Sequence, residues 1–188
     1  MKLLKLAALA VLFSVSSYAQ GTVEKSLFNV QTGLTPLAIN HEAKLGDRFA
    51  LRSELSFALR AYWTLYDSGY AFTPVINLEP RWYYNIAKRE GKGKRTDNNS
   101  ANFIGLASRY SSDWVVLGGL PDYFTIPNSV SFVPKWGIRR GIGQSNFNFE
   151  FSTGLGYFFF PDQESQKYSS KKDGLTVHLD FRIGYTFK

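Results

Sequence analysis

The segment LTVHLDFRIGYTF, Leu175 to Phe187, decides the fold. Its odd-numbered positions are all aliphatic or aromatic, and its even-numbered positions are charged, polar or glycine. Successive side chains of a β-strand point to opposite faces, so this period of two predicts a strand with one apolar and one polar face. The pattern lasts thirteen residues, whereas strands of globular proteins usually have about 5 to 6. A membrane-spanning strand needs about 9 to 11, so the length favours a membrane strand.

The same alternation recurs along the chain. The predicted strands cover residues 26–33, 37–43, 49–63, 72–85, 101–111, 129–139, 146–158 and 175–187. Gly33 to Pro36 is interpreted as a tight turn, and without it the first two strands would be one. Pro80 has no amide hydrogen to donate, so its strand is expected to contain a bulge or local irregularity. An even strand count fits a barrel with both termini in the periplasm. The fold class is therefore all-β, an eight-stranded antiparallel up-and-down transmembrane β-barrel.

This topology assigns each connection to one side of a membrane. Residues 45–48, 86–100 and 141–145 face the periplasm, and residues 33–36, 64–71, 112–128 and 161–174 face the outside. Periplasmic turns are usually the short ones, so 86–100 departs from the rule. It contains the basic run KREGKGKR, Lys88 to Arg95. We interpret this run as a solvated connection, with contact to lipid phosphates or an acidic partner as the alternative.

The N-terminus has the features of a signal peptide. Lys2 and Lys5 precede an apolar stretch, and Ser17 to Ala19 gives a small-x-small cleavage site. We therefore predict a signal peptide at residues 1–19, an outer-membrane barrel domain at residues 20–188, and the cell outer membrane as the location.

Composition limits the partners. The chain has no cysteine, which excludes disulfides and thiolate metal sites. Its formal charge of +7 is modest, and an exported protein is not expected to bind nucleic acid. Its 16 Phe, 11 Tyr and 4 Trp residues suit strands and membrane interfaces. The expected partner is outer-membrane lipid, with a larger outer-membrane protein complex as a further candidate. No phosphate-binding loop or metal-spaced cluster is present, so no cofactor is expected.

Several strings resemble a known family. They are VQTGL (30–34), NHEAKLGDRFALRSEL (40–55), LEPRWYYNIAKREGKGK (78–94), NNSANFIGL (98–106) and WGIRR (136–140). Together they look like a family of small outer-membrane β-barrels common in Bacteroidetes, and the aromatic Phe187 near the terminus resembles the closing strand of bacterial outer-membrane barrels. The resemblance implies the barrel fold. It implies no catalytic residue, because the family has no established activity.

The polar faces of the strands place many charges inside the barrel. The predicted lumen network comprises Glu42, Arg52, Glu54, Arg60, Glu79, Arg81, Arg109, Lys135, Arg139, Glu150, Asp180 and Arg182. Side chains just fill an eight-stranded barrel, and an isolated ion out of water costs several kcal/mol. These charges are therefore expected to pair and to close the lumen. The predicted role is structural or protein-interacting, not enzymatic.

Other functions stay open as alternatives. A lipid-modifying or proteolytic barrel would need His178 or His41 at the outer rim, and His178 shares a face with Asp180, which could orient a general base. A small pore would need a continuous water path, and a soluble lipocalin-like barrel would turn its apolar face inward. Trp114, Tyr123 and Phe124 lie in an apolar connection that is a candidate interaction loop. The equal alternative is that part of this connection lengthens the flanking strands above the bilayer.

Overall fold

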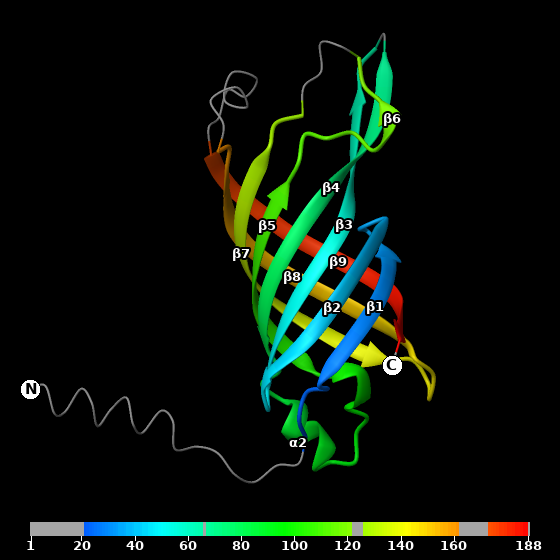
Figure 1. The fold of residues 1–188 in the computed structure, drawn as a ribbon, viewed down its shortest axis with the longest axis vertical. Coiled ribbons are helices and arrows are strands. Elements are labelled where there is room, and N and C mark those ends of the chain that lie inside the picture. Colours follow the sequence, from blue (N-terminus) through cyan, green and yellow to red (C-terminus); the bar gives the residue numbers. More distant parts are fainter. Residues whose placement is uncertain (1–20, 66, 122–125, 162–172, 188) are drawn as a thin grey trace, which may run out of the picture.

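The computed structural model describes residues 21–65, 67–121, 126–161 and 173–187. The predicted signal peptide, residues 1–19, lies outside the described residues. The barrel strands are β1 (Ser26–Gly33), β2 (Leu37–Gly46), β3 (Phe49–Trp63), β4 (Ser68–Trp82), β5 (Asn102–Ser111), β7 (Ser129–Gly141), β8 (Phe147–Phe159) and β9 (Asp173–Phe187). They form a sheet in the order β3-β2-β1-β9-β8-β7-β5-β4, which the β3–β4 pairing closes. The predicted eight-stranded antiparallel barrel is confirmed (Figure 1).

The strand boundaries follow the predicted pattern within three residues, apart from the start of β4. β1 ends at Gly33 and β2 begins at Leu37, so the predicted turn separates two strands. β4 begins at Ser68 instead of residue 72, because its ladder with β3 continues without interruption to the pair Trp63 and Ser68. A short strand, β6 (Leu117–Gly119), pairs with the start of β4. This β3–β4–β6 extension projects beyond the rest of the barrel wall (Figure 1).

Pro80 causes a local irregularity but no bulge. Its ladder with β3 is continuous and includes the pair Leu51 and Pro80. On the other side, the pairs with β5 stop at Leu78 and resume at Arg81 in the same register. This gap is consistent with a proline that has no amide hydrogen to donate to β5.

The connection between β4 and β5 is folded against one end of the barrel. It contains a short helix, α2 (Ile86–Glu90), and a 3-10 turn, η1 (Asp97–Asn99). Ile86 is fully buried, as are Asn98 and Asn99. The prediction of a solvated connection concerned the basic run Lys88 to Arg95, in which Lys88, Lys92 and Lys94 are exposed and Arg89 and Arg95 are half-buried. The burial therefore affects the residues that flank this run. Both described ends of the chain lie at the same end of the barrel as α2 (Figure 1). No helix in the described ranges is long and apolar enough to cross a membrane.

A small apolar core fills the barrel end next to α2. It consists of Val23, Ala50, Tyr83, Ile86, Ala101 and Phe103. The Phe103 ring lies under the Arg81 guanidinium, 4.0 Å from carbon to ring centroid. The tip of the same ring lies against Gly137, where an added Cβ would lie 2.3 Å from Phe103 Cζ. Position 137 therefore has no room for a side chain.

We expect Gly137→Ala to lower the free energy of unfolding by about 1 to 3 kcal/mol, the usual cost of overpacking a filled core. Urea titration of the refolded barrel in lipid vesicles measures this. Gly119→Ala in β6 is the matched control, because a Cβ at Gly119 meets nothing within 4 Å. Equal stabilities for the two variants would show that Phe103 moves aside freely.

Candidate functional site

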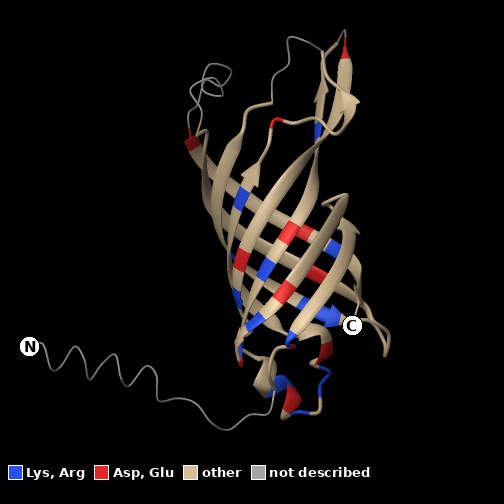
Figure 2. Ribbon diagram, in the orientation of Figure 1, with Lys and Arg blue, Asp and Glu red and all other residues tan. Residues whose placement is uncertain are grey.

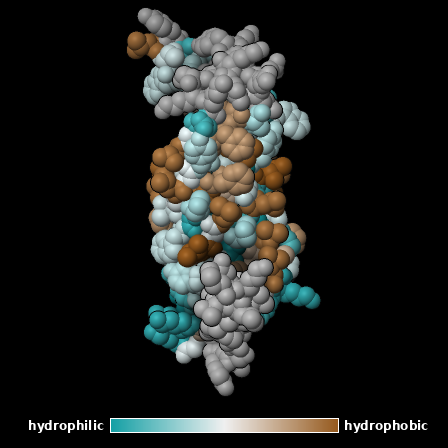
Figure 3. Space-filling model, turned by 90° about the vertical axis from the view of Figure 1, so that its left-hand side faces the viewer, coloured by the Kyte–Doolittle hydropathy of each residue, from teal (hydrophilic) through white to brown (hydrophobic). Residues whose placement is uncertain are grey.

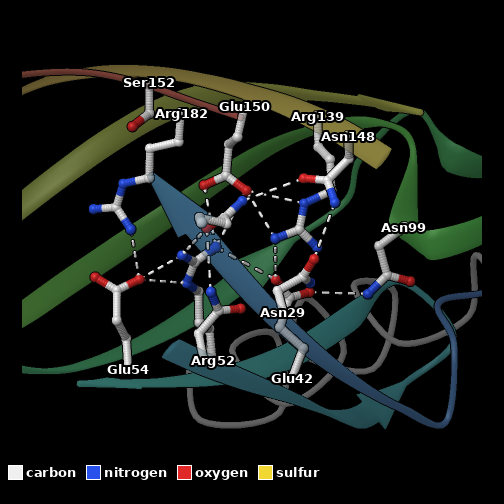
Figure 4. Close-up of polar contacts among 12 residues, drawn as sticks. Asn29, Glu42, Arg52, Glu54, Asn99, Arg139, Asn148, Glu150, Ser152 and Arg182 are labelled. Carbon is white, nitrogen blue, oxygen red and sulfur yellow. Dashed lines mark hydrogen bonds and ion pairs between the residues drawn. The ribbon is translucent and has the colours of Figure 1, made fainter. Parts of the chain in front are cut away.

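The middle of the lumen is occupied by two glutamates and three arginines, each from a different strand. Arg139 Nη2 lies 2.7 Å from Glu42 Oε1 and 2.8 Å from Glu150 Oε2. Arg81 contacts the same two carboxylates at 3.3 and 2.7 Å, and Arg52 contacts them at 3.7 and 3.2 Å. All three arginines have at most 1% of their surface exposed. Figure 4 shows the side chains of Arg52 and Arg139 reaching toward the two carboxylates.

Further ion pairs extend this centre on both sides. Glu54 pairs with Arg52 and, at 2.7 Å, with Arg182, which also binds Asp180. Glu79 accepts Arg81 Nε at 2.8 Å and Lys135 Nζ at 2.8 Å. The structure thus joins ten of the twelve predicted lumen residues into one network. Its members are five cations, Arg52, Arg81, Lys135, Arg139 and Arg182, and five anions, Glu42, Glu54, Glu79, Glu150 and Asp180.

The network is neutral as a result, which reduces the cost of burying its charges. Basic and acidic positions are spread over several strands of the barrel wall (Figure 2). Two of the predicted lumen residues, Arg60 and Arg109, do not belong to the network. Neither has a carboxylate within 4.0 Å among the described residues.

The connection between β4 and β5 completes the network at its lower side. The Tyr83 hydroxyl donates to Glu42 Oε2 at 2.7 Å, and Asn99 Nδ2 donates to the same oxygen at 2.9 Å. Burial raises the pKa of the Tyr83 phenol, so it remains a donor. Asn98 and Asn99 both have positive φ, 54° and 56°, a conformation that asparagine tolerates better than most residues. This turn carries the Asn99 amide into the lumen.

Two cations of the basic run fix this connection in place. Arg89 donates to the carbonyl oxygens of Ser100 and Arg95 at 2.8 and 3.0 Å. Arg95 binds Asp97 and reaches the carbonyl oxygens of Gly143 and Ser145 in the turn between β7 and β8. The hydrogen bond to Asp97 raises the pKa of Arg95. Arg89 and Arg95 therefore have a structural role. Their presence in a run of like charges did not distinguish them from the solvated cations beside them.

A set of neutral polar side chains links the strands where the chain ends meet. Asn148 Nδ2 donates to Asn29 Oδ1 and Thr186 Oγ1, both at 3.0 Å. Gln31 Oε1 accepts Asn40 at 3.1 Å and Arg52 at 2.6 Å, which connects these amides to the charged network. These neutral residues were not among the predicted lumen residues, although their inward positions on the alternating strands are a signal that could have identified them.

The two histidines lie in different environments, one inside the barrel and one on its outer wall. His178 Nε2 lies 3.0 Å from Ser152 Oγ and 3.5 Å from Arg109 Nη2. The Asp180 carboxylate is bound by Arg182 and Thr35, so no carboxylate of the described residues contacts the imidazole. His41 lies on the outer wall near the start of β1, where it stacks on Phe28 and contacts Ser26 Oγ at 2.8 Å.

The candidate interaction loop is described only in part. Trp114 is 72% exposed, whereas Tyr123 and Phe124 lie outside the described residues. Nearby, on the β3–β4–β6 extension, Trp63 is 90% exposed and Leu117 is 64% exposed. The described part of this region therefore carries exposed apolar side chains above the barrel wall.

Aromatic side chains surround the barrel wall just above α2. Phe49 stacks on Trp82, Trp82 contacts Tyr84, and Trp136 Nε1 donates to the Tyr84 hydroxyl at 2.9 Å. Farther round the wall, Tyr185 contacts both Phe147 and Phe187. We call these residues the aromatic belt. Below it, a groove of about 450 Å³ is lined by Tyr84, Asn85, Lys88, Arg89, Lys92, Lys94 and Arg140.

No family model, curated protein or solved structure matches the chain. The resemblance to small outer-membrane barrels of Bacteroidetes stays a prediction from the motif strings. The arrangement itself can exclude water at the level of the network and present an apolar outer wall. Among the described residues, no group of three or more His, Cys, Asp or Glu side chains could hold a metal ion.

Proposed function

We propose that the chain is an integral outer-membrane β-barrel with a structural or protein-interaction role, whose lumen is closed by the salt-bridge network. The observation that carries this proposal is the inversion of polarity between the two faces of the wall. Leu179, Leu155 and Ile76 point outward and are 60, 57 and 55% exposed, whereas Arg81 and Glu79 on the inner face have at most 1% of their surface exposed. Figure 3 shows hydrophobic side chains over the middle of one face of the molecule.

The aromatic belt supports an orientation in the bilayer. Aromatic residues gather at both membrane interfaces of outer-membrane barrels, and cations just beyond such a belt can reach lipid phosphates. The groove below the belt carries Lys88, Lys92, Lys94 and Arg140. We infer that α2 lies on the periplasmic side, together with the first and last described residues of the chain.

The test is membrane fractionation combined with gel mobility in SDS with and without boiling. We expect the protein in the outer-membrane fraction and a mobility shift on heating, because a closed barrel resists SDS until it is boiled. A water-soluble protein in the periplasmic fraction would contradict the proposal. A small pore is tested separately, since ion conductance across a planar bilayer above that of the lipid alone would show a water path through the lumen.

The interaction role is favoured by the β3–β4–β6 extension. Trp63, Trp114 and Leu117 are exposed beyond the barrel wall, and exposed apolar patches often mark contact sites. Cross-linking of intact cells tests this role: we expect a discrete cross-linked species that Trp63→Ser with Trp114→Ser abolishes and Lys88→Gln retains. An identical pattern for all variants would contradict it.

A further inference from the structure

Two lumen cations remain after the network is complete. Arg60 of β3 and Arg109 of β5 lie on the side of the network away from α2, where β3 and β4 continue toward their extension. Arg60 Nη2 donates to Ser111 Oγ at 2.8 Å, and Arg109 Nη2 lies near the His178 ring. Arg60 Nε is shielded from solvent and has no hydrogen-bond partner in the described part of the chain.

Both arginines line one cavity of about 640 Å³, which we call the vestibule. Among the described residues that line it, none is acidic. A smaller cavity of about 210 Å³ shares Arg109 and Val75 with the vestibule and reaches Glu54 and Arg182 of the network. The vestibule is therefore a positively charged space directly above a neutral, closed layer.

The rest of the vestibule is chemically mixed. Hydroxyl groups come from Ser111, Ser129 and Ser131, and apolar surface comes from Val75, Ile126 and Phe158. Its volume falls in the range of small-molecule sites, about 300 to 1,000 Å³, which typically combine an apolar lining with a few polar anchors. A bare inorganic anion would leave the apolar surface unused.

We propose that the vestibule binds an organic anion, with a carboxylate or phosphate head group held by Arg60 and Arg109 and an apolar body lying against Val75, Ile126 and Phe158. Guanidinium groups bind both head groups through paired, charge-assisted hydrogen bonds. The ligand would supply the negative charge that the network does not provide to these two arginines. The inference depends on the lumen geometry and goes beyond the proposed membrane role.

Calorimetric titration of the protein in lipid nanodiscs tests the proposal, with protein-free nanodiscs as the blank. The probes are octanoate, octyl phosphate, neutral octanamide and inorganic phosphate. We expect the protein to bind at least one of the two organic anions. We expect its affinity for octanamide and for inorganic phosphate to be at least about tenfold lower than for that anion, since a hydrogen bond to a charged group contributes about 1.5 to 3 kcal/mol. A preference between octanoate and octyl phosphate identifies the head group.

The variants Arg60→Gln and Arg109→Gln are each expected to weaken binding by about tenfold or more, whereas Lys88→Gln, at the other end of the barrel, leaves it unchanged. Neither arginine has a carboxylate partner in the described residues, so both Gln variants should keep their heat-modifiable mobility. If Arg60→Gln does not fold, Arg60→Lys replaces it in the titration, because lysine retains the charge but loses the forked geometry.

Three outcomes with the organic probes and the variants would overturn the proposal, and a fourth concerns inorganic phosphate. They are no binding of either organic anion, equal binding of octanamide, and wild-type affinity in both Gln variants. Inorganic phosphate binding as tightly as the organic anions would also overturn it, because the apolar lining would then play no part. Failure of the protein to enter nanodiscs would instead contradict the membrane role, so the two failures are distinguishable.

Discussion

Glu150→Gln is expected to lower the free energy of unfolding by about 3 to 5 kcal/mol, the usual cost of removing one partner from a buried ion pair. The Glu150 carboxylate lies within 3.2 Å of Arg52, Arg81 and Arg139, and none of these arginines is appreciably exposed. Glutamine keeps the size of the side chain, so the change removes charge without opening a cavity. The network would then hold five cations and four anions.

Urea titration of the barrel in lipid vesicles, followed by tryptophan fluorescence, measures this loss. Asp47→Asn is the matched control, because it removes a carboxylate from a surface ion pair in which Lys44 Nζ lies 3.0 Å from Asp47 Oδ1 and Asp47 is 78% exposed. Exposed pairs contribute about 0 to 1 kcal/mol. If Glu150→Gln lowered the free energy of unfolding no more than the control does, water or rearranged side chains would have replaced the lost contacts of the three arginines. The network would then not close the lumen.

Ile76→Arg is expected to destabilise the membrane-inserted barrel by about 2 to 4 kcal/mol, because a lipid-facing arginine near the bilayer midplane must leave water. Ile76 is 55% exposed on the outer wall, six residues from Trp82 of the aromatic belt. It pairs across the wall with Leu55 and Tyr110, which are also exposed. The substitution therefore places one charge among apolar neighbours without disturbing the lumen.

Unfolding in lipid vesicles measures the effect, and Leu45→Arg provides the control. Leu45 is 63% exposed near the end of β2, at the level of Phe49 of the belt, where an arginine can reach water. We expect that variant to change stability by less than about 1 kcal/mol, as charges near the interface do. If Ile76→Arg were as stable as Leu45→Arg, the outer wall would face water and the membrane role would be contradicted.

The alternation of side chains accounts for what the sequence could predict. A period of two determines which side chains share a face, so Arg52, Arg81 and Glu150 could be assigned to one lumen although they lie far apart in the chain. It does not determine the height of a residue along the barrel, which depends on how neighbouring strands are staggered. For this reason Arg60 and Arg109 were assigned to the network, whereas they lie above it.

Local sequence also failed where an irregular segment makes long-range contacts. The run at Lys88 to Arg95 is basic and polar, and nothing in it indicates that Ile86 is buried or that Asn99 reaches Glu42, 57 residues away. The contact requires consecutive asparagines with positive φ, a conformation that periodicity does not reveal. The early start of β4 depends on its pairing with β3, which a single strand's pattern does not determine.

The pairing of β1 with β9 has a consequence for folding. Asn29 and Thr186 share a hydrogen bond across 157 positions of the chain, and β9 is the only neighbour that β1 and β8 have on that side of the described sheet. Contacts between such distant residues slow folding, because a long loop must close first. A chain stopped before Asp173 would expose two unpaired strand edges, which promote aggregation. The barrel therefore cannot close until β9, the last strand and fifteen residues long, is present.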